Sequence, residues 1–170
     1  MKTLLLIIIT TGVTALSAFK VEDARRLYVK SVEDEKTAEK LYKSLKNTND
    51  VLLKGYRGAA QTILAKHYIN PISKWNYFSD GCEELDAAIK SVPTDPELRF
   101  LRFSIQTNAP AFLGYNGNIY EDKDVIIDNL ALLKFDNNHE MRELIVDYLL
   151  ETSYCTYSEK KMIKETLASK

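Results

Sequence analysis

The sequence feature that most constrains the fold is a helical pattern followed by a short break and a second helical pattern. Apolar residues recur at spacings of three and four over residues 75–92, which is the period of one helix face. The break is Pro93-Thr94-Asp95-Pro96. Thr94 or Asp95 is a suitable helix cap, and Pro96 suits the first helical turn. The sequence therefore predicts a hairpin of two helices.

The first helix of this hairpin carries the clearest apolar stripe in the chain. Its two and a half or so heptads are too few for an extended coiled coil. We therefore expect a helix whose stripe faces a protein core, with a free cysteine behaving as a small hydrophobe inside it. The stripe consists of Trp75, Phe78, Cys82, Leu85, Ile89 and Val92.

Helical periodicity also dominates the rest of the chain. The expected segments are 21–32, 38–45, 51–69, 122–134, 138–151 and 158–168, besides the hairpin helices at 71–92 and 96–107. Small residues at Gly55, Gly58 and Ala59 predict that another helix passes close to the third segment. Residues 109–121 lack a period and contain the turn signal Asn116-Gly117, where a short hairpin is one option. We predict an all-α domain of seven or eight helices over residues 19–170.

The N-terminus predicts export. Met1-Lys2 supplies a positive start, Leu4–Ile9 is an unbroken apolar run, and the small residues Ala15, Ser17 and Ala18 suit a signal peptidase. The apolar stretch is shorter than the roughly 20 residues that span a bilayer. We expect residues 1–18 to be a cleaved secretory signal peptide, and the mature protein to be periplasmic or secreted without stable membrane insertion.

Charge and cysteine content exclude some classes of partner and leave others open. The 23 basic residues nearly balance 24 acidic ones, for a net charge of -1. This balance gives no basic excess to attract nucleic acid. The chain has two cysteines, Cys82 and Cys155. Export would place them in a compartment where disulfides form, but the sequence leaves open whether the two side chains meet.

The first helix of the hairpin resembles the second helix of a tetratricopeptide-type repeat at Gly81, Leu85, Ala88 and Pro93. The match covers half of one repeat, and Asn70-Pro71 breaks what would be the preceding helix. The resemblance implies antiparallel helix hairpins stacked as a bundle or a short TPR-like solenoid. The whole chain also resembles small exported all-helical proteins of bacteria without an assigned function, which implies no chemistry.

Motifs for catalysis, metals and cofactors are absent from the sequence. His67 and His139 have no histidine or cysteine at the spacing of a metal site, and no Gly-x-Ser-x-Gly elbow or phosphate loop occurs. We therefore predict no catalytic residue, metal or cofactor. A catalytic triad assembles from distant residues in some enzymes, so a hydrolase with such a site remains an alternative.

One polar stripe is a candidate binding site. Arg99, Arg102 and Gln106 recur at three and four residues on the helix after Pro96, and two guanidinium groups one turn apart suit a carboxylate, phosphate or sulfate. The other interpretation is that both arginines pair with acids such as Glu84 or Asp128. The adjoining loop adds aromatic and amide side chains suited to a peptide or sugar: Phe112, Tyr115, Asn116 and Tyr120.

These features predict an exported, non-enzymatic helical module that binds a protein or peptide partner through a groove between helices. The first alternative is a small-molecule or anion binder that uses Arg99 and Arg102. The second alternative is the hydrolase with a spatially assembled site. The oligomeric state is left open by the sequence.

Overall fold

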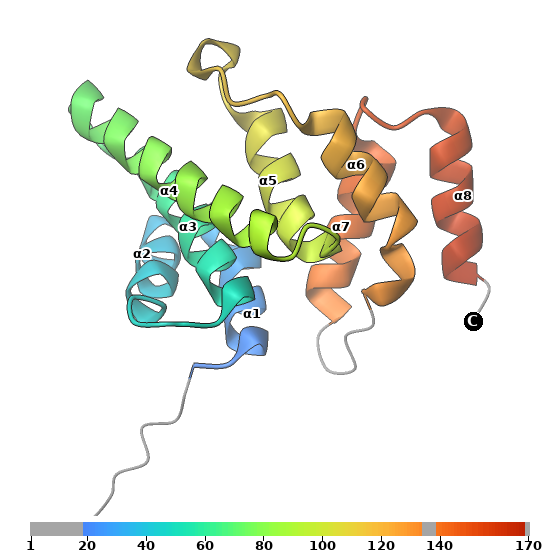
Figure 1. The fold of residues 1–170 in the computed structure, drawn as a ribbon, viewed down its shortest axis with the longest axis horizontal. Coiled ribbons are helices and arrows are strands. Elements are labelled where there is room, and N and C mark those ends of the chain that lie inside the picture. Colours follow the sequence, from blue (N-terminus) through green and yellow to red (C-terminus); the bar gives the residue numbers. More distant parts are fainter. Residues whose placement is uncertain (1–18, 134–138, 169–170) are drawn as a thin grey trace, which may run out of the picture.

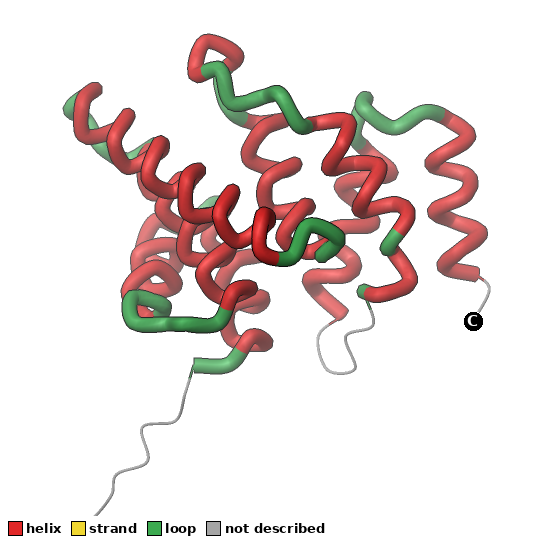
Figure 2. Tube along the Cα trace, in the orientation of Figure 1, coloured by secondary structure: helices red, strands yellow, loops and turns green. Residues whose placement is uncertain are grey.

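The computed structural model describes residues 19–133 and 139–168 and confirms the predicted all-α class. Within these ranges the chain forms eight α-helices and two 3-10 turns and no strand (Figures 1 and 2). None of these helices is both long and apolar enough to cross a membrane. In chain order the elements are α1 (Val21–Ser31), α2 (Glu35–Ser44), α3 (Val51–Ala65), α4 (Pro71–Ser91), α5 (Pro96–Asn108), η1 (Ala111–Leu113), α6 (Ile119–Asp128), η2 (Leu130–Leu132), α7 (His139–Glu151) and α8 (Tyr157–Ala168).

Side-chain caps explain why several helices begin where they do. The carboxylates of Asp34, Asp50 and Asp95 and the amide oxygen of Asn70 accept hydrogen bonds from backbone N–H groups of the first turn that follows. Those N–H groups have no partner within the helix itself. The predicted start of the second hairpin helix, with Asp95 as cap and Pro96 in the first turn, is confirmed.

Several predicted boundaries differ from the structure, including the start of the second helix at Glu35 rather than Ala38 and the end of α6 at Asp128 rather than Lys134. The third helix ends at Ala65 rather than Ile69, because the N–H groups of His67 and Tyr68 bond three residues back and tighten the chain into a turn. Helix α6 begins at Ile119 rather than Asp122, with the buried Ile119 side chain anchoring its first turn. The irregular loop forms the 3-10 turn η1 rather than a hairpin.

Most helices pack against their neighbours in sequence. Helices α1 to α6 follow one another in contact, and α1 also touches α7, so the C-terminal half returns to the N-terminal half (Figure 1). The α3–α4 pair makes the most extensive contact of all. The predicted signal peptide at residues 1–18 lies outside the described residues and stays a prediction.

The α3–α4 crossing depends on two glycines that let the backbones approach closely. A Cβ atom added to Gly58 would lie 2.6 Å from the carbonyl oxygen of Gly81, and one added to Gly81 would lie 2.7 Å from that of Gly58. Both distances are well inside van der Waals contact with rigid backbone atoms. The close helix approach predicted from the small residues of the third segment is therefore confirmed, with Gly81 as its unforeseen counterpart on α4.

The predicted core stripe of α4 is right at its centre and wrong at its ends. Cys82, Leu85 and Ile89 are buried, but Trp75 is 49% exposed and Val92 39% exposed. The reason is length, since α4 has 21 residues and its main partner α3 has only 15. At 1.5 Å per residue, α4 extends about 9 Å beyond the length of α3, so its ends leave the core.

Two further features complete the interior. Cys82 and Cys155 are both buried free thiols, so the disulfide that the sequence left open is not formed.

Arg25 of α1 donates to both carboxylate oxygens of the buried Glu97 on α5, at 2.8 and 2.7 Å, and the Tyr56 hydroxyl donates to the same carboxylate. The bidentate Arg25–Glu97 pair fixes α1 against α5, and the Tyr56 hydroxyl joins α3 to the same carboxylate.

Replacing Gly58 with alanine tests the crossing. We expect Gly58→Ala to lower the free energy of unfolding by about 1–3 kcal/mol or more, because the new methyl group overpacks against α4 backbone that has no space to move. Urea denaturation followed by circular dichroism measures the change.

Gly117→Ala is the matched control, because an added Cβ at Gly117 meets no atom within 4 Å. We expect this control to change stability by no more than about 0.5 kcal/mol. If Gly58→Ala is as stable as Gly117→Ala, the helices do not depend on this close approach.

Candidate functional site

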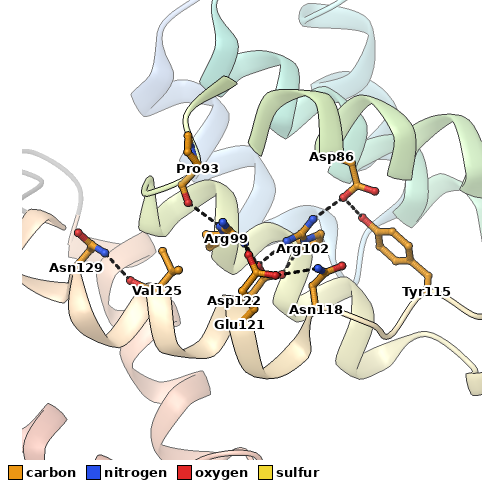
Figure 3. A network of polar contacts seen from close by, with 10 residues as sticks. All are labelled: Asp86, Pro93, Arg99, Arg102, Tyr115, Asn118, Glu121, Asp122, Val125 and Asn129. Atoms are coloured by element: carbon orange, nitrogen blue, oxygen red, sulfur yellow. Dashed lines mark hydrogen bonds and ion pairs between the residues drawn. The ribbon is translucent and has the colours of Figure 1, made fainter. Parts of the chain in front are cut away.

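The predicted arginine stripe is built around one buried carboxylate. Asp122 on α6 is completely buried, and it lies between Arg99 and Arg102 on α5 (Figure 3). The Arg99 guanidinium donates to Asp122 at 2.7 Å, and Arg102 donates to both of its oxygens, each at 2.7 Å. Such a charge is tolerated in a core only because several charge-assisted hydrogen bonds replace its water.

The same guanidinium groups also hold the surrounding segments. Arg99 donates to the Pro93 carbonyl at 2.8 Å and to Glu121 at 2.7 Å, and Arg102 donates to Asp86 on α4 at 2.9 Å. Burial alone would lower the pKa of Arg102, but its hydrogen bonds to Asp122 and Asp86 outweigh burial and raise that pKa. Arg102 is therefore a permanent cation that joins α4, α5 and α6.

This geometry favours pairing within the chain over an exposed anion clasp. The acids are not the predicted Glu84 or Asp128, since Glu84 bonds instead to Arg57 at 2.9 and 3.0 Å. An incoming anion would have to compete with Asp122, which is already in place and shielded from water. The two arginines thus position α6 and the break before α5, and the anion-binding alternative stays a prediction.

The third residue of the stripe, Gln106, is also buried. Its side-chain amide makes no hydrogen bond within the described part of the chain. A buried amide without a partner is unfavourable by about 1–3 kcal/mol. Its exposed fraction of 3% removes it from the surface that a partner would first meet.

The predicted aromatic loop is divided between the surface and the core. Phe112 is 87% exposed, Tyr120 and Asn116 are exposed, and Tyr115 is half-buried. Tyr115 donates from its hydroxyl to Asp86 at 2.9 Å, and its ring meets Phe78 of α4 edge to face, with centroids 5.9 Å apart. Burial, followed by the nearby Cys82 and Asp86, raises the pKa of Tyr115. The loop is thus anchored to α4 through Tyr115 while Phe112 faces solvent.

Sequence reasoning missed an exposed apolar segment at the start of α4. Ile69 is 98% exposed, Ile72 is 72% exposed, and Trp75 is half exposed, although all three lie within seven residues. In Figure 1 the α3–α4 pair reaches past the neighbouring helices at this end. Ile69 and Ile72 are large apolar residues that fall outside the core stripe of α4. Their position outside that stripe is the sequence signal from which their exposure could have been predicted.

A groove of about 480 Å³ lies between α3 and α4. Most of its lining residues are charged, and the predicted partner-binding groove between helices stays a prediction. Its walls are Val51, Lys54, Arg57, Asp80, Glu83, Glu84, Ala87, Ala88 and Ser91. Such a groove lacks the apolar anchor pockets that dominate most protein interfaces.

Histidines and acids are the side chains from which a catalytic or metal site would be built. The ring of His67 lies beside Glu35, with Nδ1 3.4 Å from the carboxylate. The side chain of His139 lies outside the described residues. Within those residues, no three His, Cys, Asp or Glu side chains form a group able to hold a metal ion.

Comparison with known proteins adds no relative. No family model, curated protein or solved structure matches the chain.

Substituting the buried carboxylate tests its role. We expect Asp122→Asn to lower the free energy of unfolding by about 3–5 kcal/mol, because it leaves two buried guanidinium groups without their shared counter-charge. Thermal and urea denaturation measure the loss.

Asp128→Asn is the control on the same helix, since Asp128 is exposed. We expect its effect to stay within about 0.5 kcal/mol. Equal stability of the two variants would contradict the view that Asp122 holds α5 and α6 together.

Proposed function

We propose that this chain is an exported, non-enzymatic helical module that binds a protein or peptide partner. The observation that carries the proposal is the exposure of Ile69, Ile72 and Trp75 within seven residues at the start of α4, and of Phe112 on η1. We call these four residues the α4–η1 surface. Exposed apolar residues scattered singly are ordinary, whereas a group of large ones marks a site of interaction.

The energy available from covering this surface is substantial. Burying one large apolar side chain contributes about 1.5–3 kcal/mol, and three of the four are at least 72% exposed. Tryptophan and other aromatic residues are enriched among the few side chains that dominate binding energy. A partner that covers Trp75 and Phe112 would gain such anchors.

The surface is held in place before any partner arrives. The Phe78–Tyr115 ring contact and the Tyr115–Asp86 hydrogen bond fix η1 against α4. Helix α4 is itself fixed by the Gly58–Gly81 crossing with α3. A surface that is ordered in advance loses less conformational entropy on binding. This order supports a role in binding for these side chains.

Export rests on the signal-peptide pattern, and one structural observation supports the predicted cleavage point. Phe19, directly after Ala18, packs against the hydrophobic core. Cleavage after Ala18 would keep this residue in the folded domain. The proposal thus assigns the bundle from residue 19 onward to the mature protein.

The export part is tested by the mass of the protein in its native cells. We expect the chain recovered from the periplasm or medium to begin at Ala18 or Phe19, because the peptidase removes the apolar run. Intact-mass spectrometry of each fraction measures this. A full-length chain found in the cytoplasm alone would contradict export and leave the binding surface to be judged separately.

The binding part is tested by affinity capture from the same fractions. We expect the double variant Ile72→Asp/Phe112→Asp to recover at least about tenfold less of any specific partner, because two charges replace the apolar anchors. Emission from Trp75, the only tryptophan in the chain, should shift to shorter wavelength when the captured partner covers it.

Tyr157→Asp is the matched control, because Tyr157 is exposed and lies on α8, away from η1 and the start of α4. It should bind like the unmodified protein. Equal recovery with the double variant, together with unchanged Trp75 emission, would refute the proposed surface. Concentration-dependent dimerisation lost in the double variant would show that a second copy of the chain covers it.

A further inference from the structure

A second, smaller cavity lies on another part of the molecule, where α2, the end of α3 and α4 meet. Its volume is about 210 Å³. It shares no residue with the α4–η1 surface and does not depend on the function proposed for that surface. Its lining combines three tyrosines with two carboxylates: Glu35, Glu39, Tyr42, Lys43, Leu64, His67, Tyr68 and Tyr77.

The three tyrosines form a continuous aromatic wall. The Tyr68 and Tyr77 ring centroids are 4.4 Å apart, and those of Tyr42 and Tyr77 are 6.1 Å apart. All three side chains are only half-buried, so part of each ring stays accessible. A hydrogen bond with Tyr77, assisted by burial, raises the pKa of Tyr68 to about 12, so this phenol is neutral at physiological pH. The face of a neutral aromatic ring attracts cations.

The charges beside this wall are predominantly negative. Glu35, Glu39 and Tyr42 lie on one face of α2, at the spacings of four and three that align side chains along a helix. Glu39 pairs with Lys43 at 2.7 Å, and Glu35 lies near His67. The lining thus holds two carboxylates, Glu35 and Glu39, against the one ammonium group of Lys43.

These ion pairs leave the carboxylates open to competition. The side chains of Glu39 and Lys43 are 54% and 69% exposed. An exposed pair of this kind contributes only about 0–1 kcal/mol. A second cation can therefore share or replace Lys43 at Glu39 at little energetic cost.

We propose that this cavity binds an organic cation, an ammonium or guanidinium group, between the tyrosine wall and the α2 carboxylates. The aromatic faces supply cation–π attraction, and Glu35 and Glu39 supply the counter-charge. An anion would meet two carboxylates. A neutral ligand can donate hydrogen bonds to them but gains no attraction between opposite charges.

The size of the cavity limits the ligand to a small group. Pockets for drug-sized ligands measure about 300–1,000 Å³, and this one is smaller at about 210 Å³. It suits a free small cation, or one lysine or arginine side chain of a larger partner. Both sources share the same chemistry, and the probes below distinguish them.

The test uses the chain from residue 19 onward and nuclear magnetic resonance shifts of backbone amides. The probes are choline, its neutral analogue 3,3-dimethylbutan-1-ol, and the N-acetyl amides of lysine, arginine and norleucine. We expect the cationic probes to shift amides around Tyr42, Tyr68 and Tyr77 with millimolar affinity, since so small a ligand makes few contacts. The neutral probes, which match them in shape, should leave these amides unchanged.

Variants separate a binding site from a simple packing cluster. Tyr68→Leu and Glu39→Gln should each weaken cation binding about two- to fivefold, through loss of ring face and of counter-charge respectively. Lys43→Met keeps the aliphatic stem but frees Glu39, so it should strengthen binding about twofold or more. If the three tyrosines served only to stabilise the fold, Lys43→Met would not be expected to strengthen cation binding.

The matched controls are Tyr157→Leu, an exposed tyrosine on α8, and Glu83→Gln, an exposed acid of the larger groove. Both should bind the probes like the unmodified protein. Choline binding with no lysine or arginine binding indicates a free small cation, and the reverse indicates a partner's side chain. The proposal is overturned if no cation shifts these amides, or if the neutral analogues bind equally well.

Discussion

The close crossing of α3 and α4 is the constraint on which the rest of the structure depends. Gly58 and Gly81 remove the side chains that would hold the two backbones apart. Their approach brings α4 against α3, where Leu85 is buried, and so sets where α4 lies in the bundle. Asp86, which holds η1, and Tyr77, which completes the tyrosine wall, both depend on it. One backbone contact thus supports both surfaces for which binding is proposed.

Buried charge supplies the second level of order. Asp122 joins α5 to α6 through Arg99 and Arg102, and Glu97 joins α5 to α1 through Arg25. Removing one partner from such a pair is far more costly than losing a surface ion pair. These arginines therefore act as structural links, and the side chains available to a partner are those that the links leave exposed. Those side chains are apolar at the start of α4 and aromatic beside α2.

The two proposed binding regions face different directions because α4 serves both. Trp75 and Tyr77 are two residues apart, which corresponds to a rotation of about 200° around a helix. One side therefore belongs to the α4–η1 surface, and the other contributes to the tyrosine cavity. This arrangement is possible because α4 is longer than α3, so the first turns of α4 have fewer neighbours. A core helix that extends beyond its packing partner presents apolar residues to solvent while its far end stays fixed.

The sequence by itself determined the helices and the hairpin. Periodic apolar residues, caps such as Asp95 and the proline at 96 act within a few residues, so local physics sets them. The same local reasoning identified the small residues that bring α3 close to another helix. It did not identify Gly81 as their counterpart. It offered pairing of Arg99 and Arg102 with acids as one interpretation, but with Glu84 or Asp128 rather than the buried Asp122. Only the tertiary structure decided which acids those arginines meet, and how far α4 outreaches α3 to expose Trp75, because contacts between distant segments depend on how the helices pack.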